Sequence, residues 1–67
     1  MPLDLQAILA LMTTRGLSQR ALGRLAGIDQ PRISRIVNGH QVEHIELAVV
    51  QRLAAALGVG VEAILRK

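Results

Sequence analysis

The sequence predicts an all-α domain built from five short helices. Its apolar residues recur about every 3.6 residues, the period of an amphipathic helix, and capping residues and glycines divide the chain into short segments. The 67 residues suffice for one small domain, so we treat 1–67 as a single unit. Because the chain has no cysteine and no aromatic residue, its core has to be aliphatic, and no thiolate is available for metal binding or catalysis.

The first expected helix covers residues 4–14. Asp4 lies at its amino-terminal end, where a carboxylate interacts favourably with the helix dipole. Gly16 ends it, because glycine adopts the left-handed conformation of a helix terminus without steric cost. The expected apolar face consists of Leu5, Ile8, Leu9 and Met12.

The second helix is predicted to cover Gln19–Ala26. Ser18 is its N-cap, and Leu17 and Leu22 occupy the two positions of a hydrophobic staple, which fixes the direction in which the chain enters the helix. Gly27 stops the helix. The side chains expected to point inward are Leu22, Leu25 and Ala26.

The same pattern repeats at once in a third helix within Asp29–Asn38. Asp29 is the expected N-cap, and Ile28 and Ile33 form the second staple. Pro31 is tolerated because the first turn of a helix has no intrahelical partner for its N–H groups. The helix ends at Asn38-Gly39, and its buried face consists of Ile33, Ile36 and Val37.

A tight turn, Gly27-Ile28-Asp29, joins the second and third helices. A three-residue turn containing glycine is typical of a helix-turn-helix, in which two helices cross at a steep angle. Gly23 fits this geometry, because a residue without a side chain lets the crossing helix approach closely. The alternative is a glycine that merely weakens its helix by about 1 kcal/mol.

The last third of the chain is predicted as a loop and two further helices. Residues His40–His44 form the loop, Glu46–Leu57 the fourth helix, and the segment marked by Val61, Ile64 and Leu65 a short fifth helix. The apolar run at 45–65 contains charged residues and two glycines, so we expect no membrane partner.

Positive charge is concentrated in the centre of the chain. Five of its eight basic residues lie between 15 and 39, where Asp29 is the only carboxylate, and the net charge of the chain is +3. This clustering favours a surface that faces phosphates. On charge alone, a solvated face would be the favoured interpretation.

The segment GLSQRALGRLAGIDQPRISRIVNG (16–39) resembles the phage Cro and repressor-type (XRE-like) helix-turn-helix family, and RLAAALGVGVEAIL (52–65) resembles the last two helices of the same fold. The resemblance extends from Leu5 to Leu65 and implies a five-helix, lambda-repressor-like DNA-binding domain with its motif at about 19–38. It also implies a cytoplasmic, bacterial or phage-encoded regulator of transcription, expected to be a repressor. Such a regulator binds a pseudo-palindromic operator in double-stranded DNA as a homodimer, with the helix at about 30–38 in the major groove.

The resemblance assigns roles by position. The residues expected to read bases are Gln30, Pro31, Arg32, Ser34 and Arg35. Those expected to contact phosphates or to brace the reading helix are Arg15, Ser18, Gln19, Arg20, Asn38, Gly39 and His40. For the helix-end residues Ser18, Asn38, Gly39 and His40, which rest on the chemistry of helix ends, the alternative is plain capping, and for Arg15 and Arg20 it is a solvated position. Arg24 is expected to point away from DNA. Because Pro31, Arg32 and Arg35 depart from the better-known phage repressors, the target sequence cannot be carried over.

A second interpretation is an antitoxin-like interaction module, which binds a toxin or another regulator through its apolar fourth and fifth helices and regulates its own promoter. An enzyme is not expected, because no nucleophile–base pair and no cofactor motif are visible. His40-Gln41-Val42-Glu43-His44 matches the H-x-x-E-H pattern of zinc peptidases, but that chemistry requires the pattern on a helix beside a cleft. We therefore expect no metal there.

Overall fold

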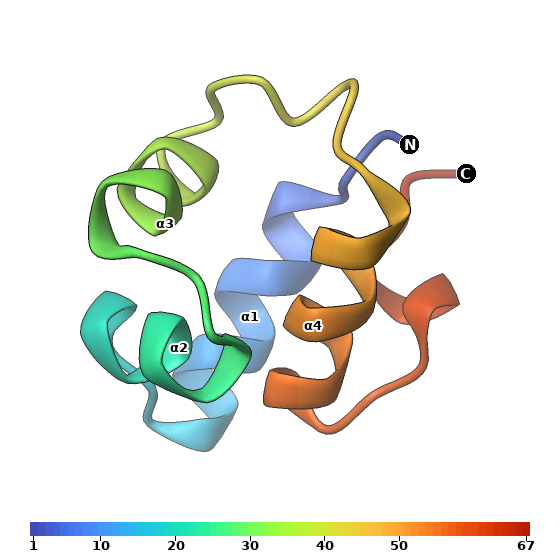
Figure 1. Cartoon of the computed structure of the whole chain (residues 1–67). Coiled ribbons are helices and arrows are strands. Elements are labelled where there is room, and N and C mark those ends of the chain that lie inside the picture. The colour runs from blue at the N-terminus through green and yellow to red at the C-terminus, as the bar shows by residue number, and fades with distance from the viewer.

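The computed structural model describes every residue from Met1 to Lys67 and confirms the all-α prediction. It has four α-helices, namely α1 (Leu5–Arg15), α2 (Gln19–Ala26), α3 (Gln30–Val37) and α4 (Leu47–Leu57), followed by the 3-10 helix η1 (Val61–Ile64). In the view of Figure 1, α1 is seen in the centre with α2 and α3 to its left and α4 to its right, and α2 packs against both α3 and α4. None of these helices has the length and apolar character needed to span a bilayer.

The prediction of a fifth α-helix is not confirmed, because Val61–Ile64 forms a single 3-10 turn. The chain then becomes extended at Leu65, which forms an antiparallel bridge with Leu3. The N–H of Arg66 donates to the carbonyl of Pro2 at 3.1 Å, and the N–H of Asp4 donates to the carbonyl of Ile64 at 2.8 Å. These bonds hold the chain extended where another helical turn would have to form.

The amino-terminal segment also fixes the loop between α3 and α4. The terminal ammonium of Met1 donates to the carbonyl of Ile45 at 2.9 Å, and the N–H of Leu3 donates to the carbonyl of Val42 at 2.7 Å. The Leu3 side chain is almost fully buried. Both chain ends therefore lie together beside α4 (Figure 1), and they close the domain at the end where the loop enters that helix.

The core is aliphatic, as its composition requires. Fifteen buried hydrophobic residues form one cluster to which all four α-helices contribute, and no polar residue is buried. The most deeply buried side chains are Leu3, Ile8, Leu22, Ile33, Ile36, Val50, Leu53, Leu57 and Ile64.

Two leucines expected on buried faces are exposed instead, 41% for Leu9 and 61% for Leu25, and Leu47 at the start of α4 is 49% exposed. Leu25 shows the cause. The buried face of α2 is formed by Leu22, Gly23 and Ala26, and Leu25 lies two residues beyond Gly23, which is about 200° around the helix. Because α2 turns Gly23 toward its neighbour, Leu25 faces solvent.

The close contact between α2 and α3 confirms the role expected of Gly23. A Cβ built on Gly23 would lie 2.8 Å from the carbonyl oxygen of Ile28 and 3.2 Å from Cγ1 of Ile33. The Gly23 carbonyl in turn accepts the N–H of Ile28 at 2.9 Å, while Gly27 turns the chain in a left-handed conformation with φ +70°. The turn and the start of α3 are therefore held directly against the backbone of α2.

We predict that Gly23→Ala destabilises the domain. In an open helix the change would stabilise by up to about 1 kcal/mol, but here the new methyl group meets a backbone oxygen, and overpacking of this kind costs about 1–3 kcal/mol. The free energy of unfolding is measured in urea, with Ala55→Gly as the control that gives the helix-propensity effect at an exposed site of α4. A more stable Gly23→Ala protein would contradict the role assigned to this contact.

Candidate nucleic-acid interface

The helix α3 lies at the surface with one face buried and one face open. Ile33, Ile36 and Val37 attach it to the core. None of the five residues expected to read bases is buried: Gln30, Pro31 and Arg35 are exposed, and Arg32 and Ser34 are half-buried. All five project from one helix that is held rigidly by its apolar face, as a surface that reads another molecule requires.

The first residues of α2 and α3 meet side chain to side chain. The Gln30 amide Nε2 donates to Oε1 of Gln19 at 3.4 Å, so the structure brings together the pair expected to form a brace. Ser18 caps α2, because its hydroxyl oxygen accepts the N–H of Ala21 at 3.1 Å. The roles of Ser18, Gln19 and Gln30 toward DNA stay predictions.

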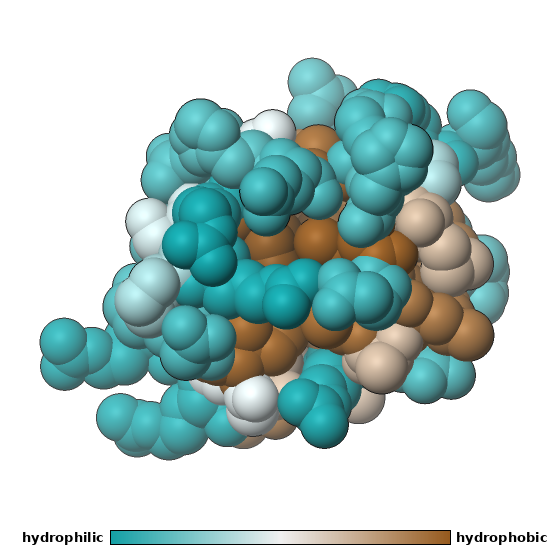
Figure 2. Space-filling view, turned by 45° about the horizontal axis from the view of Figure 1, so that its top comes forward, coloured by the Kyte–Doolittle hydropathy of each residue, from teal (hydrophilic) through white to brown (hydrophobic).

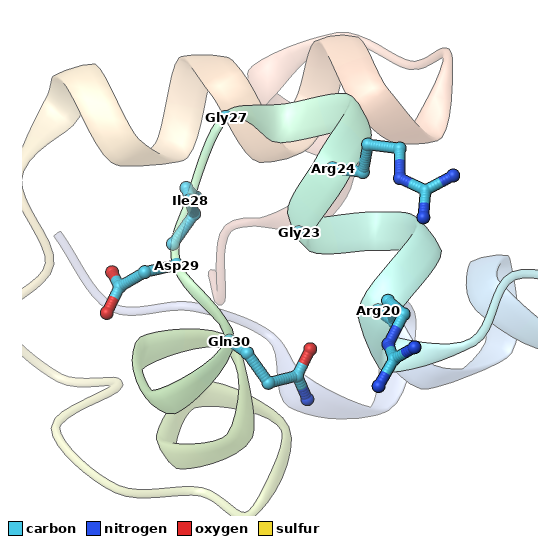
Figure 3. Close-up of a pocket in the computed structure, with 7 residues that line it drawn as sticks. All are labelled: Arg20, Gly23, Arg24, Gly27, Ile28, Asp29 and Gln30. Atoms are coloured by element: carbon cyan, nitrogen blue, oxygen red, sulfur yellow. The ribbon is translucent and has the colours of Figure 1, made fainter.

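A shallow groove of about 400 Å³ lies between α2 and the start of α3. It is lined by Arg20, Gly23, Arg24, Gly27, Ile28, Asp29 and Gln30. Figure 3 shows Gln30 pointing toward Arg20, Arg24 leaving α2 on the same side as Arg20, and Asp29 turned away from both arginines.

The two arginines of this groove have no acidic partner. The structure contains two salt bridges, Arg32–Glu46 and Arg66–Glu43, and neither involves Arg20 or Arg24. Like charges four residues apart on a helix repel each other, so the pair is slightly unfavourable to the isolated fold. Beside Gln30 the groove therefore holds two arginines without an ion-pair partner, and its one carboxylate, Asp29, is turned away from both.

The position of Arg24 beside Arg20 was not expected from the sequence, and its role toward DNA stays a prediction. Arg24 was expected to point away, but it lines the same groove as Arg20. The spacing of the two residues nevertheless indicated that Arg24 lies beside Arg20, because residues four apart on a helix share a face.

The amino terminus of α3 lacks the side-chain cap expected from Asp29. Asp29 occupies the N-cap position with an extended backbone, yet its carboxylate accepts no hydrogen bond from the helix. An N-cap side chain bonds the N–H of the second or third helical residue. Pro31 removes the second of these donors, and the third, the N–H of Arg32, receives no bond from Asp29. The positive end of this helix dipole thus has no side-chain acceptor next to the two arginines.

Arg32 differs from the other arginines of the motif because it is engaged within the fold. Its Nη2 donates to Oε1 of Glu46 at 2.6 Å, and 34% of its side chain is exposed. A hydrogen bond from the backbone N–H of Glu46 and the bond from Arg32 both lower the pKa of the Glu46 carboxyl. Glu46 is therefore an ionised partner of Arg32 at neutral pH.

The other predicted contact residues lie at helix ends. The Asn38 amide Nδ2 donates to the Ser34 carbonyl at 2.8 Å and thus caps α3, and Gly39 and His40 follow in the exposed loop. Arg15 is elsewhere: its guanidinium lies over Gly58, where a Cβ would meet it at 2.7–3.0 Å. That position is the negative end of the α4 dipole, so the structure gives Arg15 a role within the fold.

The H-x-x-E-H pattern does not assemble into a metal centre. Its carboxylate, Glu43, accepts a hydrogen bond from Arg66, and this contact lowers the pKa of Glu43. No group of three His, Cys, Asp or Glu side chains converges anywhere in the chain.

Comparison with known proteins relates this chain to a protein family and to solved structures. The helix-turn-helix family matches residues 8–64. The crystal structure of the restriction-modification controller protein C.AhdI from Aeromonas hydrophila is similar, with a TM-score of 0.80 and 28% sequence identity. The similarity covers 90% of this chain and 88% of that protein. No curated protein sequence matches this chain significantly.

Proposed function

The chain belongs to the helix-turn-helix family, and from that premise we propose that it is a sequence-specific regulator of transcription that places α3 in the major groove of double-stranded DNA. The family match and the likeness to a controller protein both support a DNA-binding regulator. One observation carries the proposal: an exposed reading helix begins beside two arginines that no carboxylate neutralises.

The chemistry of the exposed α3 residues suits base edges. The Gln30 amide offers a donor and an acceptor that match N6 and N7 of adenine, and the Arg35 guanidinium offers the fork that matches O6 and N7 of guanine. Ser34 can bond either kind of edge, and Pro31 supplies an apolar surface for a thymine methyl group. The major groove is about 12 Å wide and admits a single helix of this kind.

Phosphate contacts would hold this helix in place. Arg20 and Arg24 supply unpaired charge on one side of Gln30, and Gln19 supplies an amide that is hydrogen-bonded to it. Contacts of this type fix the orientation of a protein on the duplex without reading sequence. The base-reading side chains would then meet the same base pairs in every complex.

The proposal includes repression by a homodimer on a pseudo-palindromic operator. The Cα trace of one copy extends 25 Å along its longest axis, which is less than the roughly 34 Å of one DNA turn. One copy therefore covers one half-site, and two copies related by a twofold axis fit half-sites one turn apart. Figure 2 shows apolar surface between polar side chains, and Met1 and Leu47 remain 44% and 49% exposed.

The antitoxin-like alternative receives less support from the structure. It requires an apolar docking surface on α4 and η1. Most of the large apolar side chains of these elements (Val50, Leu53, Leu57 and Ile64) are fully buried, which leaves Leu47 as the largest exposed one. Copurification of a partner protein at fixed stoichiometry would favour this alternative.

Selection from a pool of random duplexes tests the proposed function. We expect enrichment of a pseudo-palindromic site whose half-sites are centred about one helical turn apart. Arg35→Ala should weaken binding to this site far more than binding to random DNA, with a loss of about 1–3 kcal/mol. If no duplex binds better than random DNA at 150 mM salt, where exposed charges are partly screened, the proposed function is wrong.

Arg24→Ala tests the phosphate role of the groove. Because a phosphate contact is independent of sequence, affinity should fall by the same factor on selected and random duplexes, and the slope of log K against log salt should decrease by about 0.9. Arg52→Ala removes the same charge from the exposed face of α4 and serves as the control. Equal effects of the two substitutions would show that net charge, not the groove, is responsible.

A further inference from the structure

The arginines of the helix-turn-helix fall into two groups according to their partners. Arg20, Arg24 and Arg35 form no salt bridge, whereas Arg32 is paired with Glu46 at 2.6 Å. Glu46 is fourteen residues away in sequence and is the N-cap residue of α4. The pair therefore joins the first turn of the reading helix to the end of the α3–α4 loop.

The Glu46 side chain makes no capping bond to its own helix. Glu46 occupies the N-cap position of α4, but glutamate is not among the residues that usually cap a helix, and its carboxylate accepts no N–H from the first turn of α4. It turns to Arg32 across a groove that these two residues line with Gln41, His44 and Ile45. The loop behind Glu46 is held by the hydrogen bonds between Ile45 and Met1, so its position relative to α3 is fixed.

The pairing changes which ligands Arg32 attracts. A free guanidinium is drawn to any phosphate, because it carries a full positive charge. Paired with a carboxylate it is neutral overall, yet it has five N–H donors and this contact uses one. Such a group gains little from a phosphate, since Glu46 repels phosphate, but it can still donate to the uncharged acceptors on a base edge.

We propose that Glu46 is a specificity-determining residue, which neutralises Arg32 so that this arginine contributes to sequence readout and not to sequence-independent phosphate binding. The inference rests on the proposed function. It assigns a part in DNA recognition to a residue that lies outside the helix-turn-helix motif and carries the same charge as DNA.

Glu46→Gln provides the test, because it keeps the shape of the side chain and removes its charge. With Arg32 released, we expect random duplex DNA to bind about two- to fivefold more tightly, the range expected for an exposed ion pair. The salt slope on random DNA should steepen by about 0.9, the equivalent of one added phosphate contact. The ratio of selected-site to random-DNA affinity should fall about two- to fivefold, because the released Arg32 adds a phosphate contact on random DNA, whereas on the selected site it already contacts a base.

Two further variants separate this mechanism from a general charge effect. Glu43→Gln makes the same charge change and breaks the other salt bridge, Arg66–Glu43, so it should leave the ratio unchanged. In an Arg32→Gln background, Glu46→Gln should no longer steepen the salt slope. An effect of Glu46→Gln that Glu43→Gln reproduces, or that persists without Arg32, would refute the inference.

The outcome also distinguishes the two proposals. If the unaltered protein prefers its selected site but Glu46→Gln behaves like Glu43→Gln, the inference about Glu46 fails and the proposed function stands. If the unaltered protein prefers no sequence, the proposed function fails, and with it the assignment of Arg32 to readout.

Discussion

The contact between the backbone of α2 at Gly23 and the turn that follows is the constraint on which the rest of the site depends. The Ile28 carbonyl lies where a side chain of residue 23 would be, and the N–H of the same residue bonds back to the Gly23 carbonyl. This contact fixes where α3 begins and in which direction it runs. It brings Gln30 within reach of Gln19 and places the start of α3 beside Arg20 and Arg24. A larger residue at position 23 would push α3 away from α2. It would thereby separate Gln30 from Gln19 and from the two arginines without altering any of these side chains.

Salt bridges to carboxylates distinguish the arginines of the domain from one another. The domain has few acidic residues, and two of them, Glu43 and Glu46, hold Arg66 and Arg32. Arg20 and Arg24 remain unpaired and share one groove, where the proposed function places DNA phosphates. The paired arginine keeps its hydrogen-bond donors while its charge is balanced. On the proposed function, the unpaired Arg20 and Arg24 of α2 supply affinity for the DNA backbone, whereas Arg32 and Arg35 of α3 face the bases, and of these two only Arg32 has its charge balanced by a carboxylate.

The sequence predicted those features that depend on neighbours along the chain. The bounds of α2, its Ser18 cap, the Gly27 stop and the close approach at Gly23 all follow from patterns within a few residues. Prediction from the sequence failed for features that depend on contacts between segments far apart in the chain. Leu25 was expected inside because it lies three residues after Leu22, but contact with α3 at Gly23 rotates α2 so that Leu25 faces solvent. A fifth helix was expected because the pairing of Leu65 with Leu3, at the other end of the chain, cannot be inferred from neighbouring residues. The Arg32–Glu46 pair spans a loop whose course only the folded structure reveals.

Amide chemical-shift mapping during titration with the selected duplex tests the central claim most directly, because it reports on every part of the chain at once. We expect the largest shifts at the start of α2 and along α3, extending to Arg24 and to Glu46. The carboxyl end of α4 and η1 should be affected least among the residues not at a dimer contact. Shifts concentrated on α4 and η1, with α3 unaffected, would contradict the assignment of α3 as the helix that reads DNA.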